Sequence, residues 1–181
     1  ARIEIGEDNL FREGVTVNQP KVVGSVTRIG SRSRFLPGSH IAHDAEIGND
    51  VTFSRMAAVG GHACVGDHVH FEPFSGVHQF VTVGRHALLR AHTAVSEDAA
   101  PFVEFNGPNE SVGINPVLPL PRATKEALQE AYTIVWKSGL PRPEALSRLG
   151  GSPVSEVREL AEFLLRSSKG RMGRSLEKLR R

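Results

Sequence analysis

The sequence predicts an all-β parallel β-helix of triangular cross-section, followed by a small α-helical region. Apolar residues recur at a fixed step of six, a period that fits neither an ordinary helix nor a two-faced strand. Four places after each of them, from Thr27 to Ala99, the residue is small or valine. Four glycines also stand eighteen residues apart, at Gly30, Gly48, Gly66 and Gly84. The apolar series is Ile5, Phe11, Val17, Val23, Ile29, Phe35, Ile41, Ile47, Phe53, Val59, Val65, Phe71, Val77, Val83, Leu89 and Val95.

Each six-residue unit is expected to form one short strand and one corner, with the large residue inside and the small residue at the corner. Three units then complete one triangular coil of about eighteen residues, and the glycines mark a corner without room for a Cβ atom. We expect residues 1–100 to form this β-helix. Residues eighteen apart should stack on successive coils at about 4.8 Å, the spacing of paired strands.

Two stretches depart from the repeat. Asn18–Val26 contains Pro20 and breaks the small-residue rule at Lys21, so we expect a surface excursion there. Residues 101–121 are rich in proline, glycine and asparagine, which is the composition of a loop. Its length favours a functional role, as a substrate loop or linker.

Residues 122–181 are expected to form an α-helical cap. Apolar residues at helical spacing predict helices over Arg122–Lys137, Pro143–Leu149 and Ser155–Ser168, each stopped by glycine or proline. The final basic residues are expected to form a solvated tail. They are Lys169, Arg171, Arg174, Lys178, Arg180 and Arg181.

Composition narrows the class of protein. The 181 residues carry a formal charge of +2 and one cysteine, Cys64, which excludes an internal disulfide. No apolar run is long enough to cross a bilayer. We therefore expect a cytoplasmic protein with no membrane span and no nucleic-acid partner. Because the repeat starts at Ile5 with nothing to cover its first coil, we also expect the chain to be the later part of a longer protein.

The coil brings distant polar residues together. His43, Gly61 and Gln79 should form one vertical column, flanked by a column with Asp44 and His62 and by one with Gly60 and His78. A neutral imidazole, a carboxylate that orients it and an exposed backbone N–H are the parts of an acyl-transfer site. His68 and His86 are also eighteen apart, but we expect them to be surface residues.

The sequences of several segments resemble those of one family, the acyl-carrier-protein-dependent UDP-N-acetylglucosamine O-acyltransferases of lipid A synthesis. These segments are 40–44 (HIAHD), 60–62 (GGH), 77–80 (VHQF), Gly113 with Asn115, and 163–170 (FLLRSSKG). The resemblance covers nearly the whole chain. It implies a left-handed coil, although general rules for crossover connections favour the right hand. It also implies that the family's first coils lie upstream of Ala1.

The resemblance also implies roles for particular residues. His43 matches the general base that acts on the sugar 3-hydroxyl, Asp44 its orienting carboxylate, and the Gly61 N–H the donor to the thioester oxyanion. Matches to substrate-binding residues are His40, His62, His78, Gln79, Asn115 and Arg122. Ala91 matches the residue that sets acyl length, beside the bulky Arg90. The family implies a homotrimer, a UDP-amino sugar as acceptor, and a donor thioester on the 4′-phosphopantetheine of acyl-carrier protein, without another cofactor.

Departures from the family leave alternatives open. Val117 stands at the family's nucleotide-loop glutamate and Pro121 at one of its two arginines. A second interpretation is therefore a non-catalytic trimeric scaffold or binding module with the same fold. A third is a metal-dependent hydratase like the γ-class carbonic anhydrases, suggested by the eight histidines. We see no three-ligand spacing for a metal in the sequence.

Overall fold

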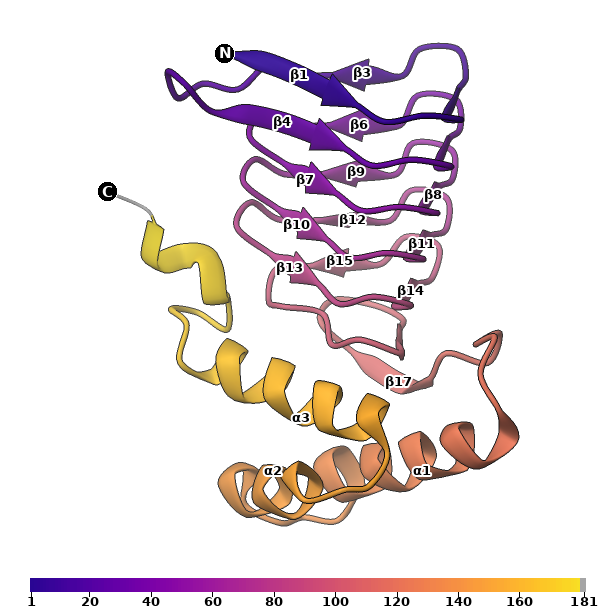
Figure 1. The fold of residues 1–181 in the computed structure, drawn as a ribbon, viewed down its shortest axis with the longest axis vertical. Coiled ribbons are helices and arrows are strands. Elements are labelled where there is room, and N and C mark those ends of the chain that lie inside the picture. Colours follow the sequence, from indigo (N-terminus) through magenta and orange to yellow (C-terminus); the bar gives the residue numbers. More distant parts are fainter. Residues whose placement is uncertain (180–181) are drawn as a thin grey trace.

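The computed structural model describes residues 1–179, without the side chains of 178 and 179, and shows a left-handed parallel β-helix capped by helices at one end (Figure 1). Three parallel sheets form the faces of the prism. Sheet A contains β1 (Arg2–Ile5), β4 (Val26–Ile29), β7 (Glu46–Ile47), β10 (Cys64–Val65) and β13 (Thr82–Val83). Sheet C contains β3 (Thr16–Val17), β6 (His40–Ile41), β9 (Ala58–Val59), β12 (Gly76–Val77) and β15 (Ala94–Val95).

Sheet B is the longest of the three. It contains β2 (Leu10–Phe11), β5 (Arg34–Phe35), β8 (Thr52–Phe53), β11 (His70–Phe71), β14 (Leu88–Leu89), β16 (Val103–Phe105) and β17 (Ser111–Ile114). We expected residues 101–121 to form a loop, but β16 pairs in parallel with β14, and β17 pairs antiparallel with β16. Sheet B therefore continues past residue 100 and ends in a hairpin.

The register confirms the predicted coil and shows one insertion. Ile29 pairs with Ile47, a step of eighteen, but Ile5 pairs with Ile29, a step of twenty-four. The six extra residues lie between β3 and β4, so the surface excursion is confirmed. The prediction that Val23 fills the interior is wrong, because it lies in this loop and is 96% exposed. The insertion is as long as one repeat, so the apolar step of six passes through it unbroken.

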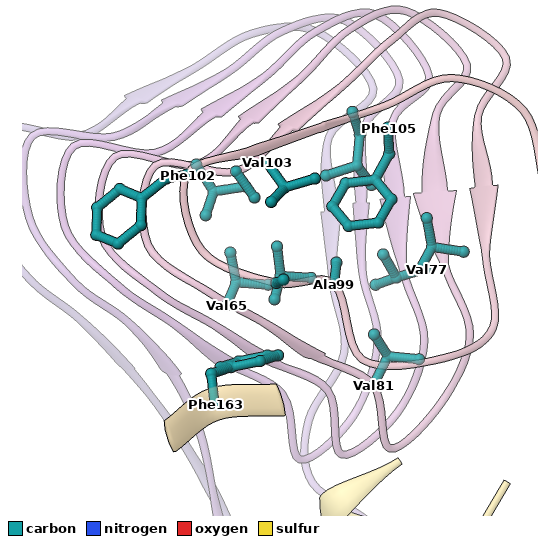
Figure 2. Packing of buried hydrophobic residues seen from close by; sticks show 14 of the residues in the cluster. Val65, Val77, Val81, Ala99, Phe102, Val103, Phe105 and Phe163 are labelled. Carbon is teal, nitrogen blue, oxygen red and sulfur yellow. The ribbon is translucent and has the colours of Figure 1, made fainter. Parts of the chain in front are cut away.

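The second residue of each short strand points into the prism. On sheet B, Phe35, Phe53 and Phe71 are fully buried and stack with ring centroids 5.2 and 4.4 Å apart. At the capped end, Phe102 and Phe105 are buried within the last coil, and Phe163 projects toward it from the helical region (Figure 2). The core is thus one continuous column inside the prism, and the helical region covers one end of it.

The corners need residues in the left-handed region of φ. From Asp44 to His92 every sixth residue has φ between 56° and 63°, a conformation in which aspartate, asparagine and histidine are enriched. The four glycines of the eighteen-residue series do not have positive φ. They are confirmed as positions without room for a Cβ, because such an atom on Gly30 would lie 2.6 Å from the Gly48 carbonyl oxygen of the next coil.

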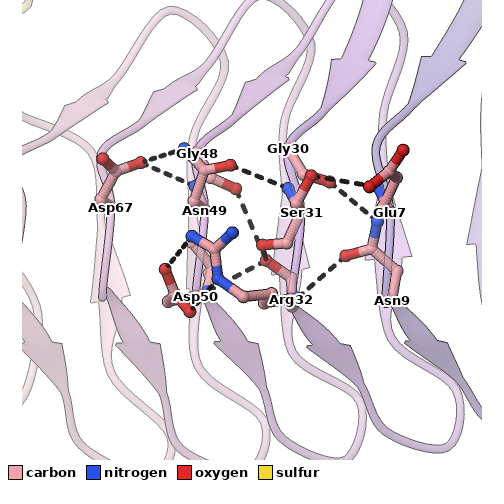
Figure 3. A network of polar contacts seen from close by, with 11 residues as sticks. Glu7, Asn9, Gly30, Ser31, Arg32, Gly48, Asn49, Asp50 and Asp67 are labelled. Carbon is pink, nitrogen blue, oxygen red and sulfur yellow. Dashed lines mark hydrogen bonds and ion pairs between the residues drawn. The ribbon is translucent and has the colours of Figure 1, made fainter.

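A ladder of polar side chains satisfies the backbone at the corner between sheets A and B (Figure 3). The side-chain oxygen of each coil accepts an N–H of the coil before it. Ser31 N donates to Asn49 Oδ1 (2.9 Å), and Asn49 N donates to Asp67 Oδ1 (2.6 Å). These bonds occupy corner N–H groups that the strands leave unpaired.

The helical region follows the prediction. It contains α1 (Arg122–Tyr132), which continues into the π-helix η1 (Thr133–Lys137), then α2 (Arg142–Gly150), α3 (Ser155–Ser168) and the 3₁₀ helix η2 (Ser175–Leu179). Arg85 of the β-helix binds Glu159 of α3 at 2.7–2.9 Å, which joins the two regions. No helix within residues 1–179 is long and apolar enough to cross a membrane.

Two expectations about the surface are wrong. Arg174 is only 4% exposed and forms an ion pair with Glu177, so it is not part of a solvated tail. Arg180, Arg181 and the side chain of Lys178 lie outside the described residues. His86 is buried rather than exposed, because it stacks on His68 (4.6 Å) and packs against Phe102 of the last coil.

Candidate active site

The candidate site lies on the edge of the prism between sheets C and A, which we call the C–A corner. It consists of the turns 42–45, 60–63 and 78–81 of three successive coils. His62 N donates to the His43 carbonyl (3.1 Å), and Phe80 N donates to the Gly61 carbonyl (3.0 Å). The turns are therefore stacked, as the eighteen-residue step predicts, and residues from three coils meet at one edge.

His43 and Asp44 form a hydrogen-bonded pair. The Nδ1 atom of His43 lies 2.8 Å from Oδ2 of Asp44, and the two side chains are 19% and 5% exposed. An ionised carboxylate only accepts hydrogen bonds, so Nδ1 is the donor. In the neutral imidazole, Nε2 is then left with its lone pair and can accept a proton.

The loop inserted before β4 holds Asp44 in place. Ser25 Oγ donates to Oδ1, and the backbone N–H of Lys21 donates to Oδ2 at 2.9 Å. Burial by itself raises the pKa of Asp44, but the bonds from Ser25, Lys21 and His43 outweigh it and lower the pKa to about 2. Asp44 is therefore ionised at any ordinary pH and fixes the orientation of the imidazole.

Gly61 lies directly against the ring of His43. A Cβ atom at this position would be 2.5 Å from Cε1 and 2.7 Å from Nε2 of His43, so only glycine leaves the ring in place. No hydrogen bond joins the Gly61 N–H to another group within residues 1–179. This N–H is therefore a free donor beside the basic nitrogen.

His62 completes a cluster with the pair. Its Nε2 lies 3.9 Å from Asp44 Oδ2, and its ring stacks on Phe80 at 4.7 Å. The potential ligand atoms of His43, Asp44 and His62 all lie within 4.8 Å of one another, so these residues could hold a metal ion. The sequence showed no three-ligand spacing, and this cluster arises only because the fold brings His62 to the adjacent residues His43 and Asp44. A metal on His43 Nδ1 would have to replace its bond to Asp44.

A groove of about 780 Å³ crosses the outer face of sheet C and reaches the C–A corner at Gly61. The outward residues of β9, β12 and β15 are small, namely Ala58, Gly76 and Ala94, which leaves the depression. The groove is mainly apolar along its length and polar at the corner. Its lining includes His40, Ala42, Met56, Ala58, Gly60, Gly61, Phe74, Gly76, Val77, His78, Gln79, Ala94 and Val95.

Three of the predicted substrate residues line this groove. They are His40, whose Nδ1 lies 2.7 Å from Thr16 Oγ1, together with His78 and Gln79 of the third coil. Gln79 lies under Gly60, where a Cβ atom would clash with its backbone nitrogen. The fold therefore gathers the predicted catalytic and groove residues at one corner.

The other predicted residues lie elsewhere in the chain. Asn115 is buried, and its amide donates to the His86 carbonyl at 2.8 Å, on the edge between sheets A and B. The side chain of Arg122 is 92% exposed and pairs with Glu126 on α1.

The two residues predicted for the acyl pocket lie at the corner between sheets B and C. Arg90 is held by Glu72 and Glu104, and the Ala91 N–H donates to Glu72. Neither residue lines the groove. Within one chain, Arg90, Ala91, Asn115 and Arg122 therefore lie away from the C–A corner that carries His43.

Three contacts of the site escaped sequence reasoning. Ser25 and the Lys21 N–H bind Asp44, and Arg174 donates to His78 Nδ1 at 3.0 Å. The inserted loop was visible from Pro20 and the broken small-residue rule at Lys21, but nothing in its composition indicated that it would bind Asp44. Arg174 is ninety-six residues from His78 and carries no signal in the sequence.

No protein-family model matches the sequence. Two sequences named acyl-[acyl-carrier-protein]–UDP-N-acetylglucosamine O-acyltransferase are similar to it. The one from Alkalilimnicola ehrlichii is 37% identical over 179 residues, covering 93% of this chain and 69% of the relative. The one from Anaeromyxobacter sp. (strain K) is 38% identical over 177 residues, covering 92% and 68%. The chain belongs to this acyltransferase family.

Solved structures of the UDP-N-acetylglucosamine acyltransferase family agree. The Arabidopsis enzyme superposes with a TM-score of 0.88 at 25% identity, over 93% of this chain and 63% of that one. The protein from Acinetobacter baumannii gives 0.81 at 30% identity, over 88% and 66%. This chain thus spans about two thirds of the length of these acyltransferases.

Proposed function

We propose that this chain transfers a fatty acyl group, hydroxylated or not, from acyl-carrier protein to the 3-hydroxyl of UDP-N-acetylglucosamine or a close analogue, the first step of lipid A synthesis. The observation that carries the proposal is the C–A corner itself. There a carboxylate-bound imidazole and a free N–H on Gly61 stand side by side at the end of an apolar groove.

The geometry supports the following chemistry. Nε2 of His43 takes the proton of the sugar hydroxyl as the oxygen attacks the thioester carbonyl. The carbonyl oxygen becomes an oxyanion, which the Gly61 N–H stabilises. Collapse of this intermediate breaks the carbon–sulfur bond, and the imidazolium returns the proton to the leaving thiolate of the 4′-phosphopantetheine. Asp44 stays ionised throughout and stabilises the imidazolium.

The groove across sheet C suits the donor. Its small and apolar lining residues, including Ala58, Gly76 and Ala94, can accommodate an acyl chain whose thioester lies near Gly61. The exposed cations Arg122, Lys169 and Arg171 are placed to attract an acidic acyl-carrier protein. Arg174 does not contribute to this attraction, because its charge is buried.

Assembly and location belong to the same proposal. We infer a cytoplasmic homotrimer with sites between neighbouring chains. In such a trimer, Arg122 contacts the nucleotide bound at a neighbour's C–A corner, and Arg90 and Ala91 border its acyl pocket. Asn115 does not contact the nucleotide in this arrangement, because it is buried and its amide is bonded to the His86 carbonyl and the Val117 N–H. The scaffold alternative gains no support from a corner in which His43, Asp44 and Gly61 are arranged for chemistry.

A His43→Ala variant tests the proposal. Transfer from acyl-acyl-carrier protein to UDP-N-acetylglucosamine, followed by mass spectrometry, should fall about 10²-fold or more, the usual scale for a general base. The matched control is His68→Ala, an exposed histidine at the corner between sheets A and B, which should keep full activity. The proposal fails if the parent chain transfers no acyl group to any UDP-amino sugar, or if His43→Ala stays as active as the control. Hydratase activity that depends on added zinc, in place of acyl transfer, would instead favour the metal-dependent alternative.

A further inference from the structure

The segment after α3 turns back and runs up beside the β-helix (Figure 1). Backbone contacts fix it there. Asp98 N donates to the Gly173 carbonyl, and Ser175 N donates to Asp98 Oδ2, both at 2.8 Å. Gly173 has φ +68°, a conformation that strains any residue with a Cβ atom. The segment therefore has a defined position against the last coils.

This segment buries the charged pair Arg174 and Glu177, and Arg174 lies beside the site. Arg174 donates from NH1 to Nδ1 of His78 (3.0 Å) and to the Ser96 carbonyl (3.2 Å), and its Nε lies 3.1 Å from Glu177. Arginine is almost never fully buried unless it is paired. Its contact with His78, which lines the groove, links the far end of the chain to the C–A corner.

The direction of the bond between Arg174 and His78 determines where the histidine proton lies. A guanidinium has only donors, so Nδ1 of His78 must accept and the ring proton must be on Nε2. The competing arrangement is an Nδ1–H that donates to the carbonyl of Gln79, 3.2 Å away. A hydrogen bond from a charged donor is the stronger of the two.

We propose that Arg174 is a positioning residue that keeps the proton of His78 on Nε2. His78 then presents an N–H donor for a substrate oxygen, and loss of Arg174 frees the ring for the Nδ1–H form bonded to Gln79. The tautomer and its dependence on Arg174 stand on geometry alone. Only the effect of this tautomer on turnover rests on the acyl-transfer function proposed above.

The first test is ¹⁵N NMR of the full chain labelled on histidine, with the His78 signals assigned by a His78→Gln variant. The wild-type spectrum should show protonated Nε2 and unprotonated Nδ1. Arg174→Met, which keeps a long side chain without a donor, should move the proton partly or fully to Nδ1. The matched control is Arg171→Met, an exposed arginine of the same segment, which should leave the spectrum unchanged.

Two outcomes of the NMR test overturn the proposal: a protonated Nδ1 in the wild type, or the same tautomer in Arg174→Met as in the wild type. If Arg174→Met does not fold, Arg174→Gln replaces it, because a neutral amide no longer imposes an accepting Nδ1. The wild-type spectrum decides the first point without any variant.

Kinetics of the full chain give the second test. Arg174→Met should lower kcat/KM about tenfold, and Arg174→Lys should restore part of the loss because an ammonium is also only a donor. In a His78→Ala background, Arg174→Met should have no further effect, since the two residues act as a unit. Additive losses would overturn the proposal. If the parent chain transfers no acyl group, the proposed function fails, while the NMR result still tests the role of Arg174.

Discussion

Replacing Asp44 by asparagine should lower the free energy of unfolding by about 2 kcal/mol at neutral pH. The pKa of Asp44 is lowered from 3.8 to about 2, and each unit corresponds to about 1.4 kcal/mol. The side chain is only 5% exposed, so solvent screens these interactions little. Asparagine cannot accept all three bonds, because its NH2 group would face either the Ser25 hydroxyl at Oδ1 or the N–H donors of Lys21 and His43 at Oδ2.

The sign of the pH dependence follows from the direction of the shift. A carboxylate whose pKa is lower in the folded state adds stability above its unfolded pKa, and this stability is lost as the pH falls through the folded value. For Asp44 the window runs from about pH 4 to about pH 2. Wild type should therefore lose about 2 kcal/mol more than Asp44→Asn over this window.

Urea unfolding of both proteins, at one protomer concentration and at several pH values from 7 to 2, measures this difference. Exposed carboxylates with lowered pKa, such as Glu4 and Asp50, are common to both proteins and cancel in the comparison. Equal concentrations are needed because association would contribute to stability. Parallel curves for the two proteins would refute the reasoning, because they would mean that Asp44 has an ordinary pKa in the folded state.

Two further predictions follow from the geometry. Gly61→Ala should lower acyl transfer about 10²-fold or more, because the new Cβ pushes the His43 ring away and disturbs the oxyanion donor. The control is Gly113→Ala, which has no atom within 4 Å of its Cβ and should be as active as wild type. Equal activity of the two variants would contradict the role assigned to Gly61. Phe53→Ala should destabilise the chain by about 3–5 kcal/mol in calorimetry or urea unfolding, whereas Val23→Ala should stay within about 0.5 kcal/mol; a large effect at Val23 would place it in the core after all.

The β-helix could be predicted because its signal is repeated many times. A step of six with large and small residues in fixed places describes every coil from Ile29 to Val95, and stacking then follows from the spacing alone. The same regularity hid the insertion before β4. A loop one repeat long leaves Val23 in step with the apolar series, so only Pro20 and the broken small-residue rule at Lys21 marked it.

The site could be predicted only where it depends on stacking. His43, Gly61 and Gln79 share a column, so their meeting follows from the period. The bonds of Ser25 to Asp44 and of Arg174 to His78 could not be predicted, because they come from segments outside the repeat. Their positions depend on how a loop and the C-terminal segment pack on the prism, which no local pattern encodes.

Coil stacking also limits how such a chain can change its length. Removing eighteen consecutive residues would join equivalent points of neighbouring coils, so most of the prism could lose or gain a whole layer and still close. Between residues 42 and 80 this freedom is absent. A deletion that spans Gly61 would bring Gln79, eighteen residues further on, against the imidazole, and one that spans His43 would remove the base itself. The shortened protein would then fold without its chemistry.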